Sequence, residues 1–340
     1  MNDLAATTDA APEPLLRIED LAVAFDTEDG EVRAVDKVSL DVWRGDVVGM
    51  VGESGCGKTV TAMSVMRLVP APPGRIVSGS VWFGGRDLLR TPVEQLREIR
   101  GREVSMIFQE PMTALSPLHT VGKQLCEAVL LHRKMTAPAA AALSLEWLGK
   151  VGVPDPGRCM DAYPHQLSGG MRQRAMIAMA LMMEPRLLIA DEPTTALDVT
   201  IQAQVLDLLR TTKRADMAIL FITHDMGIVW EICDRVAVMY AGEIAETGGT
   251  AEVFGTPGHP YTEALLGSIP SRTPKGARLV TIPGQVASST MRGNSCRFAD
   301  RCRYAFDRCR NEHPDLRSCG SRSVRCHLAE QRVGEGAWKP

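Results

Sequence analysis

A glycine-rich loop between an apolar run and a helix-compatible run constrains the fold of this chain more than any other feature. The stretch from Gly52 to Thr59 fits the pattern G-x-x-x-x-G-K-[ST]. It follows the apolar run Val47–Val51 and precedes the run Val60–Met66. A strand, a tight turn and a helix in this order place several backbone N–H groups and the positive end of a helix dipole around one anion. The sequence therefore predicts a phosphate-binding loop.

The residues of this loop have distinct expected roles in binding a nucleotide. Lys58 is expected to reach the β- and γ-phosphates, and Thr59 to bind Mg²⁺ through its hydroxyl. The predicted nucleotide-binding residues of this segment are Gly52, Glu53, Ser54, Gly55, Cys56, Gly57, Lys58, Thr59 and Val60.

Length and composition bound the class of protein. A chain of 340 residues, 45% of them apolar, can form one large domain with an appendage or two modest domains. No apolar run approaches the ~20 residues that a membrane helix needs. Residues 1–14 have acidic residues but no basic cluster and no apolar core, unlike a signal peptide. We therefore expect a cytosolic chain whose residues 1–15 are disordered.

The pattern of apolar residues predicts an α/β fold. Residues 16–52 and 76–110 alternate apolar and polar positions between turn signals, which indicates strands. Residues 137–148 are rich in alanine with leucines at helical spacing, which predicts a helical insert. Alternating strands and helices after the glycine loop predict a largely parallel sheet. From about residue 257, proline, glycine and serine predominate until a cysteine cluster, which indicates a linker and a small appended module.

Two further motifs fit nucleotide chemistry. Asp191 and Glu192 end the apolar strand Leu187–Ala190, where one carboxylate can hold Mg²⁺ and the other can polarise a water. Ser168 and Gly169-Gly170, 116 residues after Gly52, open a predicted helix whose N-terminus can accept an anion. An acidic pair that only ends a strand, and an ordinary helix cap, are the structural alternatives for these two motifs.

The combination of motifs resembles the ATP-binding subunits of ABC transporters. The segment Leu167–Gly170, between a phosphate loop and an Asp-Glu strand, is specific to that superfamily. Gln109 is similar to the Q-loop glutamine, residues 195–198 to the D-loop, and His224 to the switch histidine. Phe25 lies where the family has an aromatic residue, usually tyrosine, that stacks on adenine; a core position is the alternative. The resemblance implies a P-loop NTPase fold of ABC type, with a mixed sheet core, an antiparallel β subdomain and a helical subdomain.

The resemblance also implies a mechanism. Glu192 would orient or deprotonate water, and His224 would contact the γ-phosphate. The catalytic residues so implied are Lys58, Gln109, Glu192 and His224, and the Mg²⁺ ligands are Thr59, Gln109 and Asp191. Ser168, Gly169 and Gly170 would bind the γ-phosphate of a nucleotide held by a facing subunit, so that two ATP molecules join two ATPase subunits. Cys56 replaces the serine more usual in this loop, and we expect an active site with an oxidation-prone thiol.

A narrower resemblance, to the dipeptide and oligopeptide importers, extends from about Leu16 to His327. It rests on residues 109–117, 163–166, 191–200 and His259–Thr262. It implies an ATPase domain over residues 16–256 with a helical subdomain at about 112–182, and a C-terminal extension over 257–335. It further implies a paralogous ATPase partner, two transmembrane permease subunits, an extracytoplasmic solute-binding protein, and a peripheral position on the cytoplasmic face of the inner membrane. Close relatives carry nickel, opines, haem or sugars, so the resemblance constrains the peptide cargo less than the fold.

The tail contains five of the nine cysteines. Four of them, Cys296, Cys302, Cys309 and Cys326, have the spacing C-x₅-C-x₆-C-x₁₆-C. Four thiolates suit a [4Fe–4S] cluster and would equally suit Zn²⁺, although zinc ligands are more often paired as C-x₂₋₄-C. The resemblance implies the cluster, with Cys319 or His327 as substitute ligands and His313 less suited. Free thiols in a small domain are the remaining alternative.

The basic tail also raises a competing function. From Ser271 to the end the chain has 14 Lys and Arg against 6 Asp and Glu, although the net charge of the whole chain is −3. Such a segment can be a solvated surface, a nucleic-acid patch or a docking site for an anionic partner. A soluble ABC ATPase that acts on nucleic acid is therefore the alternative, but the transporter-type region around Gln109 argues against it, and we expect no nucleic-acid partner. A P-loop kinase or GTPase has no use for Leu167–Gly170.

Overall fold

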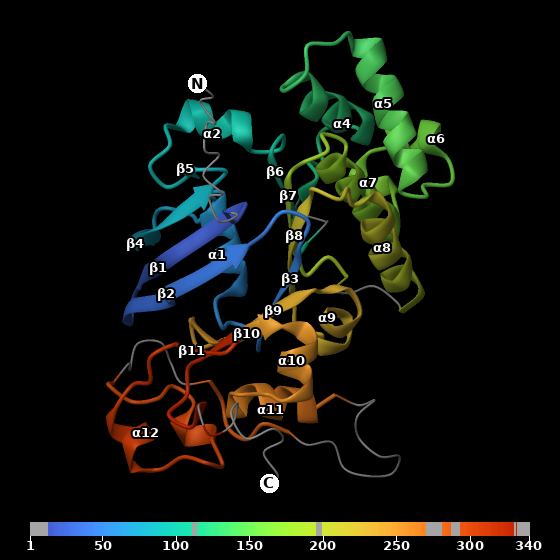
Figure 1. Ribbon diagram of the computed structural model, residues 1–340. Coiled ribbons are helices and arrows are strands. Elements are labelled where there is room, and N and C mark those ends of the chain that lie inside the picture. The colour runs from blue at the N-terminus through green and yellow to red at the C-terminus, as the bar shows by residue number, and fades with distance from the viewer. Residues whose placement is uncertain are drawn as a thin grey trace, which may run out of the picture.

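The computed structural model of the protein describes residues 13–110, 114–194, 199–269, 281–286, 293–329 and 331. In this part of the chain, helices pack around two β-sheets, and a small C-terminal module lies at one end of the molecule (Figure 1). The predicted D-loop, residues 195–198, lies outside the described residues, as do residues 1–12 of the expected disordered terminus and residues 112–113 at the start of the predicted helical subdomain.

The larger sheet has eight strands in the order β11-β12-β10-β9-β3-β8-β7-β6. The five strands from β9 to β6 are parallel, as predicted, and β10, β12 and β11 add to them in antiparallel pairs. Their bounds are β3 Val47–Val51, β6 Val104–Ile107, β7 Leu187–Asp191, β8 Ala218–Thr223, β9 Arg235–Tyr240, β10 Glu243–Gly249, β11 Arg317–Cys319 and β12 Arg322–Val324.

Both faces of the parallel strands are covered. All five residues of β3 are buried, and their side chains alternate between two hydrophobic cores. Val47 and Val51 belong to the core that contains residues of the helices between positions 121 and 232, whereas Val48 and Met50 belong to the core with the smaller sheet and the helix after the phosphate loop. Coverage on both faces explains why these strands are continuous apolar runs.

The smaller sheet is antiparallel, with the order β2-β1-β4-β5, and it forms the predicted β subdomain. Figure 1 shows it beside α1 and α2. The bounds are β1 Leu16–Thr27, β2 Gly30–Val42, β4 Gly74–Phe83, β5 Arg86–Asp87, α1 Lys58–Val65 and α2 Val93–Ile99.

The predicted helical insert is present as α5, Ala137–Lys150, whose Trp147 and Leu148 are buried. It packs with α4, α6 and α7 into one helical group above the sheet (Figure 1). Side-chain oxygens of Thr120, Thr136 and Asp155 cap the first turns of α4, α5 and α6. The bounds of the remaining core helices are α4 Val121–Leu130, α6 Pro156–Asp161, η1 Pro164–Gln166, α7 Gly169–Leu181, α8 Val199–Thr212 and α9 Met226–Ile232.

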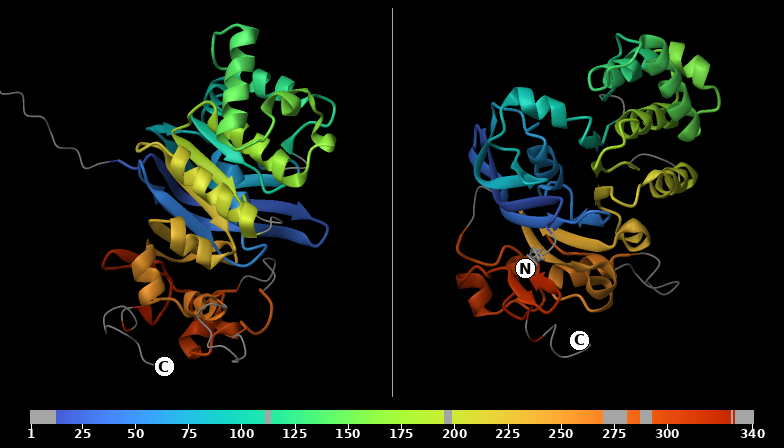
Figure 2. Two further views of the ribbon diagram at one scale, coloured as in Figure 1. Left: turned by 90° about the vertical axis from the view of Figure 1, so that its right-hand side faces the viewer. Right: turned by 45° about the horizontal axis from the view of Figure 1, so that its top comes forward.

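The C-terminal module is joined to the core more closely than the sequence indicated. Its hairpin β11–β12 pairs with β10 through Val324 and Ser323, so it extends the large sheet instead of forming a separate unit. The second view of Figure 2 shows the module against the end of the core. The other elements of this region are α10 Thr250–Gly255, α11 Pro260–Gly267, η3 Ala299–Arg301 and α12 Asp307–Asn311. No helix in the described ranges is long and apolar enough to span a membrane.

Candidate nucleotide site

The candidate residues meet at one edge of the large sheet. The strands β3, β8, β7 and β6 are successive neighbours and run parallel. The phosphate loop follows β3, His224 follows β8, Asp191 ends β7 with Glu192 directly after it, and Gln109 comes just after β6. An open α/β sheet binds ligands at the carboxyl ends of its parallel strands. The four sequence motifs therefore lie together at the edge of the sheet where a ligand is expected.

The phosphate loop holds its lysine in a defined position. Lys58 is buried, and its ammonium group donates hydrogen bonds to the backbone oxygens of Gly52 (2.8 Å) and Glu53 (3.0 Å). The loop leads into α1, whose N-cap is Gly57 with φ 108°. A Cβ at Gly57 would lie 2.5 Å from the backbone oxygen of Ala34, so this position requires glycine for both its dihedral and its contact. Lys58 and the helix N-terminus thus put positive charge at the same site.

The expectation that Cys56 is prone to oxidation is wrong. Its side chain is fully buried, and burial raises the pKa of its thiol. Oxidation requires thiolate character and access, and this thiol has neither, although its position within the loop is as predicted. Ser54 and Gly55, in contrast, are exposed, and Val60 is half-buried.

The predicted metal-binding pair is in contact. The hydroxyl of Thr59 donates a hydrogen bond to Oδ1 of Asp191, with an oxygen–oxygen distance of 3.1 Å. Asp191 is buried, and burial raises its pKa to about 6. A hydroxyl and a carboxylate are oxygen ligands of the kind that Mg²⁺ prefers, and a cation would offset the cost of ionising this buried acid. The residues therefore fit Mg²⁺.

Glu192 lies between the two other predicted catalytic side chains. Its Oε2 accepts a hydrogen bond from Nε2 of Gln109 at 3.3 Å and lies 3.4 Å from Nδ1 of His224. The side chain of Glu192 is only 12% exposed, whereas that of His224 is 60% exposed, so His224 can turn toward a ligand. Glu192 also has φ 46°, an unfavourable region for a non-glycine residue that is enriched at functional sites.

The signature residues lie elsewhere in the chain's own fold. Ser168 is the N-cap of α7 and accepts a hydrogen bond from the N–H of Met171 (3.3 Å). Ser168 and Gly169 are exposed and Gly170 is half-buried. The exposure of Ser168 and Gly169 places this helix N-terminus on the surface, while α7 itself packs with α4 and α5 in the helical group. Phe25 is half-buried on β1, where it packs against the core at Gly74; stacking on adenine stays a prediction.

Comparisons with known proteins agree with this geometry. A profile of the family described as "ABC transporter" matches residues 35–195, and one described as "Oligopeptide/dipeptide transporter, C-terminal region" matches residues 245–309. The chain is 49% identical over 324 residues to the dipeptide transport ATP-binding protein DppD of Bacillus subtilis strain 168, covering 94% of this chain and 96% of that one. The family is thereby decided. This chain is an ATP-binding subunit of the dipeptide/oligopeptide ABC transporter family.

Further relatives support the same family. DppD of Escherichia coli K12 is 46% identical over 94% of this chain and 98% of its own length. The oligopeptide transport ATP-binding protein OppD of Bacillus subtilis strain 168 is 48% identical over 86% of this chain and 82% of its own length. The solved dimeric ATP-binding cassette MJ0796, in a post-hydrolysis state bound to ADP and Pi, has a TM-score of 0.62 at 23% identity over 69% of this chain and 98% of its own, which shows a shared fold.

In this family member, two residues outside the predicted site contact the phosphate loop. The hydroxyl of Tyr261 accepts a hydrogen bond from the backbone N–H of Glu53 (2.9 Å). The guanidinium of Arg301 forms a two-bond ion pair with the carboxylate of Glu53, at 2.6 and 2.8 Å. Tyr261 belongs to the His259–Thr262 segment that carried the family resemblance, but nothing in the sequence assigned it to the site. Arg301 lies one residue before Cys302, and the cysteine pattern gave no reason to single it out.

The four tail cysteines are close in space. Burial, together with the neighbouring thiols of Cys326, Cys309 and Cys302, raises the pKa of Cys296 to about 12. The backbone N–H of Cys296 also donates to the oxygen of Cys309 (2.8 Å). The described parts of the chain nevertheless contain no group of three or more His, Cys, Asp or Glu side chains already arranged to hold a metal ion. An iron–sulfur cluster therefore stays a prediction.

The two histidines near the cysteine cluster are engaged in other contacts. Nε2 of His313 lies 2.9 Å from a carboxylate oxygen of Glu243, and Nε2 of His327 lies 3.0 Å from the backbone oxygen of Glu312. Cys319 ends the short strand β11. These contacts favour the four-cysteine set over a set that includes a histidine.

Proposed function

We propose that this chain is the ATP-hydrolysing subunit that powers the import of dipeptides or oligopeptides across the cytoplasmic membrane, by ATP-driven dimerisation with a second ATPase subunit. One observation carries the catalytic part: the Thr59–Asp191 pair and the Gln109–Glu192–His224 group stand at the ends of adjacent parallel strands, beside the phosphate loop. That is the arrangement that phosphoryl transfer to water requires.

The side chains divide the work of hydrolysis. The ammonium of Lys58, which the backbone oxygens of Gly52 and Glu53 already hold beside the loop, would donate to the β- and γ-phosphate oxygens of ATP. Thr59 and Asp191, with Gln109, would hold Mg²⁺, whose charge would offset that on the transferring phosphoryl group. Glu192 would accept a proton from, or orient, the attacking water, and the exposed His224 would contact the γ-phosphate.

The exposed signature supports a dimeric mechanism. Ser168 and Gly169 are exposed at the N-terminus of α7, where Ser168 and Gly170 would bind the γ-phosphate of ATP held by the facing subunit. MJ0796, which shares the fold, is dimeric. In this proposal a nucleotide joins two ATPase subunits, and hydrolysis of ATP separates them.

The relatives' names favour peptide cargo and a multi-subunit complex. The DppD proteins are named for dipeptide transport and OppD for oligopeptide transport. We propose a paralogous ATPase as partner, with two transmembrane permease subunits and an extracytoplasmic solute-binding protein, and a peripheral position at the cytoplasmic face of the membrane. The test is ATP hydrolysis by the complex reconstituted in proteoliposomes. Dipeptides or oligopeptides should stimulate hydrolysis; stimulation only by another solute class, such as nickel or a sugar, would refute the cargo.

The tail cysteines are proposed to ligate a [4Fe–4S] cluster. The fit rests on the donor set: the half-buried Cys296 has three further thiols, Cys302, Cys309 and Cys326, near enough to affect its charge. When bound, such a cluster would tie the short elements η3 and α12 together. Iron and sulfide analysis after anaerobic purification should give about four of each per chain. Stoichiometric zinc without iron would instead establish the alternative metal, and neither metal would leave a free-thiol module.

The nucleic-acid alternative gains no support from the tail. Several of its arginines point into the protein and pair with carboxylates: Arg297 with Asp36 and Glu243, Arg301 with Glu53, and Arg322 with Glu246. Arg301 and Arg322 have side chains only 5% and 8% exposed. Arginines that are buried and paired with carboxylates are not available to contact the phosphates of a nucleic acid. Binding of duplex DNA with a steep salt dependence would overturn this conclusion.

A further inference from the structure

The C-terminal module contacts the phosphate loop directly. Three separate groups of Glu53 are occupied: its carboxylate by Arg301, its N–H by the hydroxyl of Tyr261, and its carbonyl oxygen by the ammonium of Lys58. Two of these three partners come from beyond residue 256, outside the predicted ATPase domain. A single residue of the loop therefore connects the tail to the lysine that is expected to bind phosphate.

The contact with Arg301 is built to be rigid. The side chain of Arg301 is 5% exposed, and its Nε donates to the backbone oxygen of Pro283 at 2.8 Å. Its Nη1 also lies 3.3 Å from the hydroxyl of Tyr240. Because these groups fix the guanidinium, it is already oriented to donate two hydrogen bonds to the carboxylate of Glu53.

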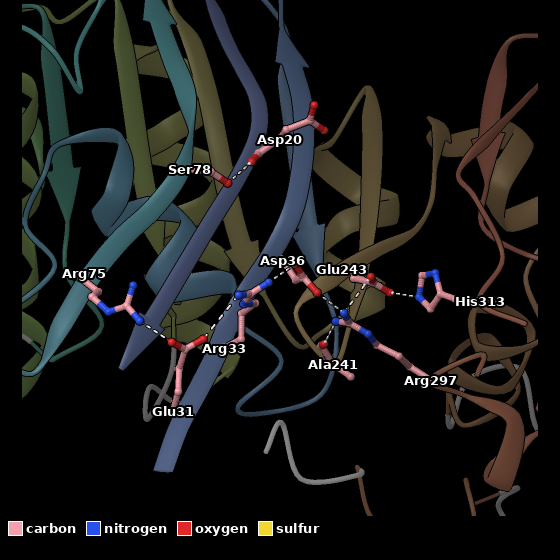
Figure 3. Close-up of polar contacts among 10 residues, drawn as sticks. All are labelled: Asp20, Glu31, Arg33, Asp36, Arg75, Ser78, Ala241, Glu243, Arg297 and His313. Atoms are coloured by element: carbon pink, nitrogen blue, oxygen red, sulfur yellow. Dashed lines mark hydrogen bonds and ion pairs between the residues drawn. The ribbon is translucent and has the colours of Figure 1, made fainter. Parts of the chain in front are cut away.

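Residues 296–302, the segment that contains Arg301, also contact the part of the phosphate loop around Cys56, through the turn at Ala241 and Gly242. Arg297, four residues before Arg301, donates to the backbone oxygen of Ala241 and pairs with Asp36 and Glu243 (Figure 3). The next residue of that turn, Gly242, donates its N–H to the backbone oxygen of Cys56 at 2.9 Å. Residues 296–302 thus hold the turn that contacts Cys56 as well as the side chain of Glu53.

We propose that Arg301 is a positioning residue for the phosphate loop, through which the C-terminal module sets the affinity of this chain for ATP. It does not contact the nucleotide. Through Glu53 it fixes the first turn of the loop, so that the backbone N–H groups and Lys58 are already arranged when the phosphates arrive; such pre-organisation lowers the cost of binding. The inference rests on the proposed function, because it presupposes that the loop binds ATP.

The test is equilibrium binding of a fluorescent ATP analogue to the full-length chain. Arg301→Met should weaken binding by about tenfold, a loss within the range measured for coupled residue pairs. Arg303→Met is the matched control: it lies in the same module, is 64% exposed and pairs with Glu263, away from the loop. It should bind the analogue as the wild type does. Equal affinities for the wild type and Arg301→Met would overturn the proposal.

Two further variants separate positioning from loss of the tail's fold. Tyr261→Phe retains the buried ring but loses the hydroxyl that accepts from Glu53, and it should also weaken binding. In a double-mutant cycle, adding Arg301→Met to Glu53→Gln should cost little more than Glu53→Gln alone. Fully additive losses would show that Arg301 acts by another route and would refute the proposal.

Hydrogen exchange distinguishes a role of Arg301 in positioning the phosphate loop from a role in stabilising the fold of the module. In Arg301→Met, amides of residues 52–59 should exchange faster while those of β11 and β12 stay protected. Faster exchange throughout the module with an unchanged phosphate loop would contradict the proposal. Failure of the wild type to bind the analogue would refute the proposed function itself, whereas normal wild-type binding with an unaffected Arg301→Met refutes only this inference.

Discussion

The hydroxyl of Thr59, on the first turn of α1, lies 3.1 Å from a carboxylate oxygen of Asp191 at the end of β7. The two residues are 132 positions apart in the chain. Their contact joins the phosphate loop to the acidic strand end across β8, which separates β3 from β7 in the sheet. It places the expected metal-binding oxygens beside the phosphate loop.

This pair predicts how stability depends on pH in the absence of nucleotide and metal. Burial raises the pKa of Asp191 from 3.8 to about 6, so the folded protein holds this proton more tightly than the unfolded chain. The contribution of Asp191 to the free energy of unfolding is therefore largest below about pH 4 and is lost as the pH rises through about 6. The loss approaches about 3 kcal/mol, since each pKa unit is worth about 1.4 kcal/mol.

Urea unfolding of the nucleotide-free protein between about pH 4 and 7 measures this effect. Other carboxylates titrate in the same range, so the comparison is with Asp191→Asn, which cannot ionise at this position. The wild type should lose stability relative to Asp191→Asn as the pH rises. Parallel curves for the two proteins would show that Asp191 ionises without penalty.

Replacement of Glu192 by glutamine should uncouple binding from hydrolysis. The amide keeps the shape that contacts Gln109 and His224 but cannot accept a proton, so turnover by the assembled complex should fall by about 10²–10⁴-fold. ATP should remain bound to the Glu192→Gln protein, and the dimer of this protein with the partner ATPase should persist. Glu231→Gln, an exposed residue near Arg210, serves as the control. Unchanged turnover in Glu192→Gln would remove this residue from the catalytic role.

Removal of the Lys58 ammonium should abolish nucleotide binding. Lys58→Ala eliminates the buried positive charge that the loop holds ready, and affinity for ATP should fall by about 100-fold or more, as for other preorganised charge contacts. Calorimetric titration with Mg·ATP measures the change. Lys150→Ala, which removes an exposed pair with Glu146 and a contact with the ring of Trp147, should bind normally. Tight binding by Lys58→Ala would mean that the loop serves another ligand.

Alanine substitutions at two glycines of the loop separate the cost of backbone strain from the cost of steric contact with an added Cβ. Both Gly55 and Gly57 have positive φ, so alanine at either costs about 1–2 kcal/mol in backbone strain. A Cβ at Gly55 meets nothing within 4 Å, whereas one at Gly57 lies 2.5 Å from the oxygen of Ala34. Gly57→Ala should therefore lower the free energy of unfolding by about 1–3 kcal/mol more than Gly55→Ala. Equal losses in denaturant unfolding would show that the loop relaxes around the added methyl.

The sequence predicted those features that depend on local pattern. The predicted strand Leu187–Ala190 is present and extends one residue further, to Asp191, because a continuous apolar run is typical of a buried parallel strand. The phosphate loop and the Asp-Glu strand end were predictable for a similar reason: each is a short motif that brings its own backbone geometry. Their assembly at one edge follows from the parallel sheet that the alternating elements predicted.

The contacts of the tail could not be predicted in this way. Arg301 and Glu53 are 248 positions apart, and their pairing depends on how the module docks against the sheet. Likewise, β12 has only three residues, too few to show an alternating pattern, yet its pairing with β10 joins the module to the core. The state of Cys56 depended on burial, which the motif alone did not specify.

The most direct test of the central claim is the structure of the assembled complex trapped with ATP by Glu192→Gln. Its decisive measurement is the distance from the hydroxyl of Ser168 to the γ-phosphate held by the phosphate loop of the facing ATPase subunit. We expect a hydrogen-bonding distance of about 2.5–3.0 Å. A Ser168 that faces solvent while ATP occupies the loop would contradict it.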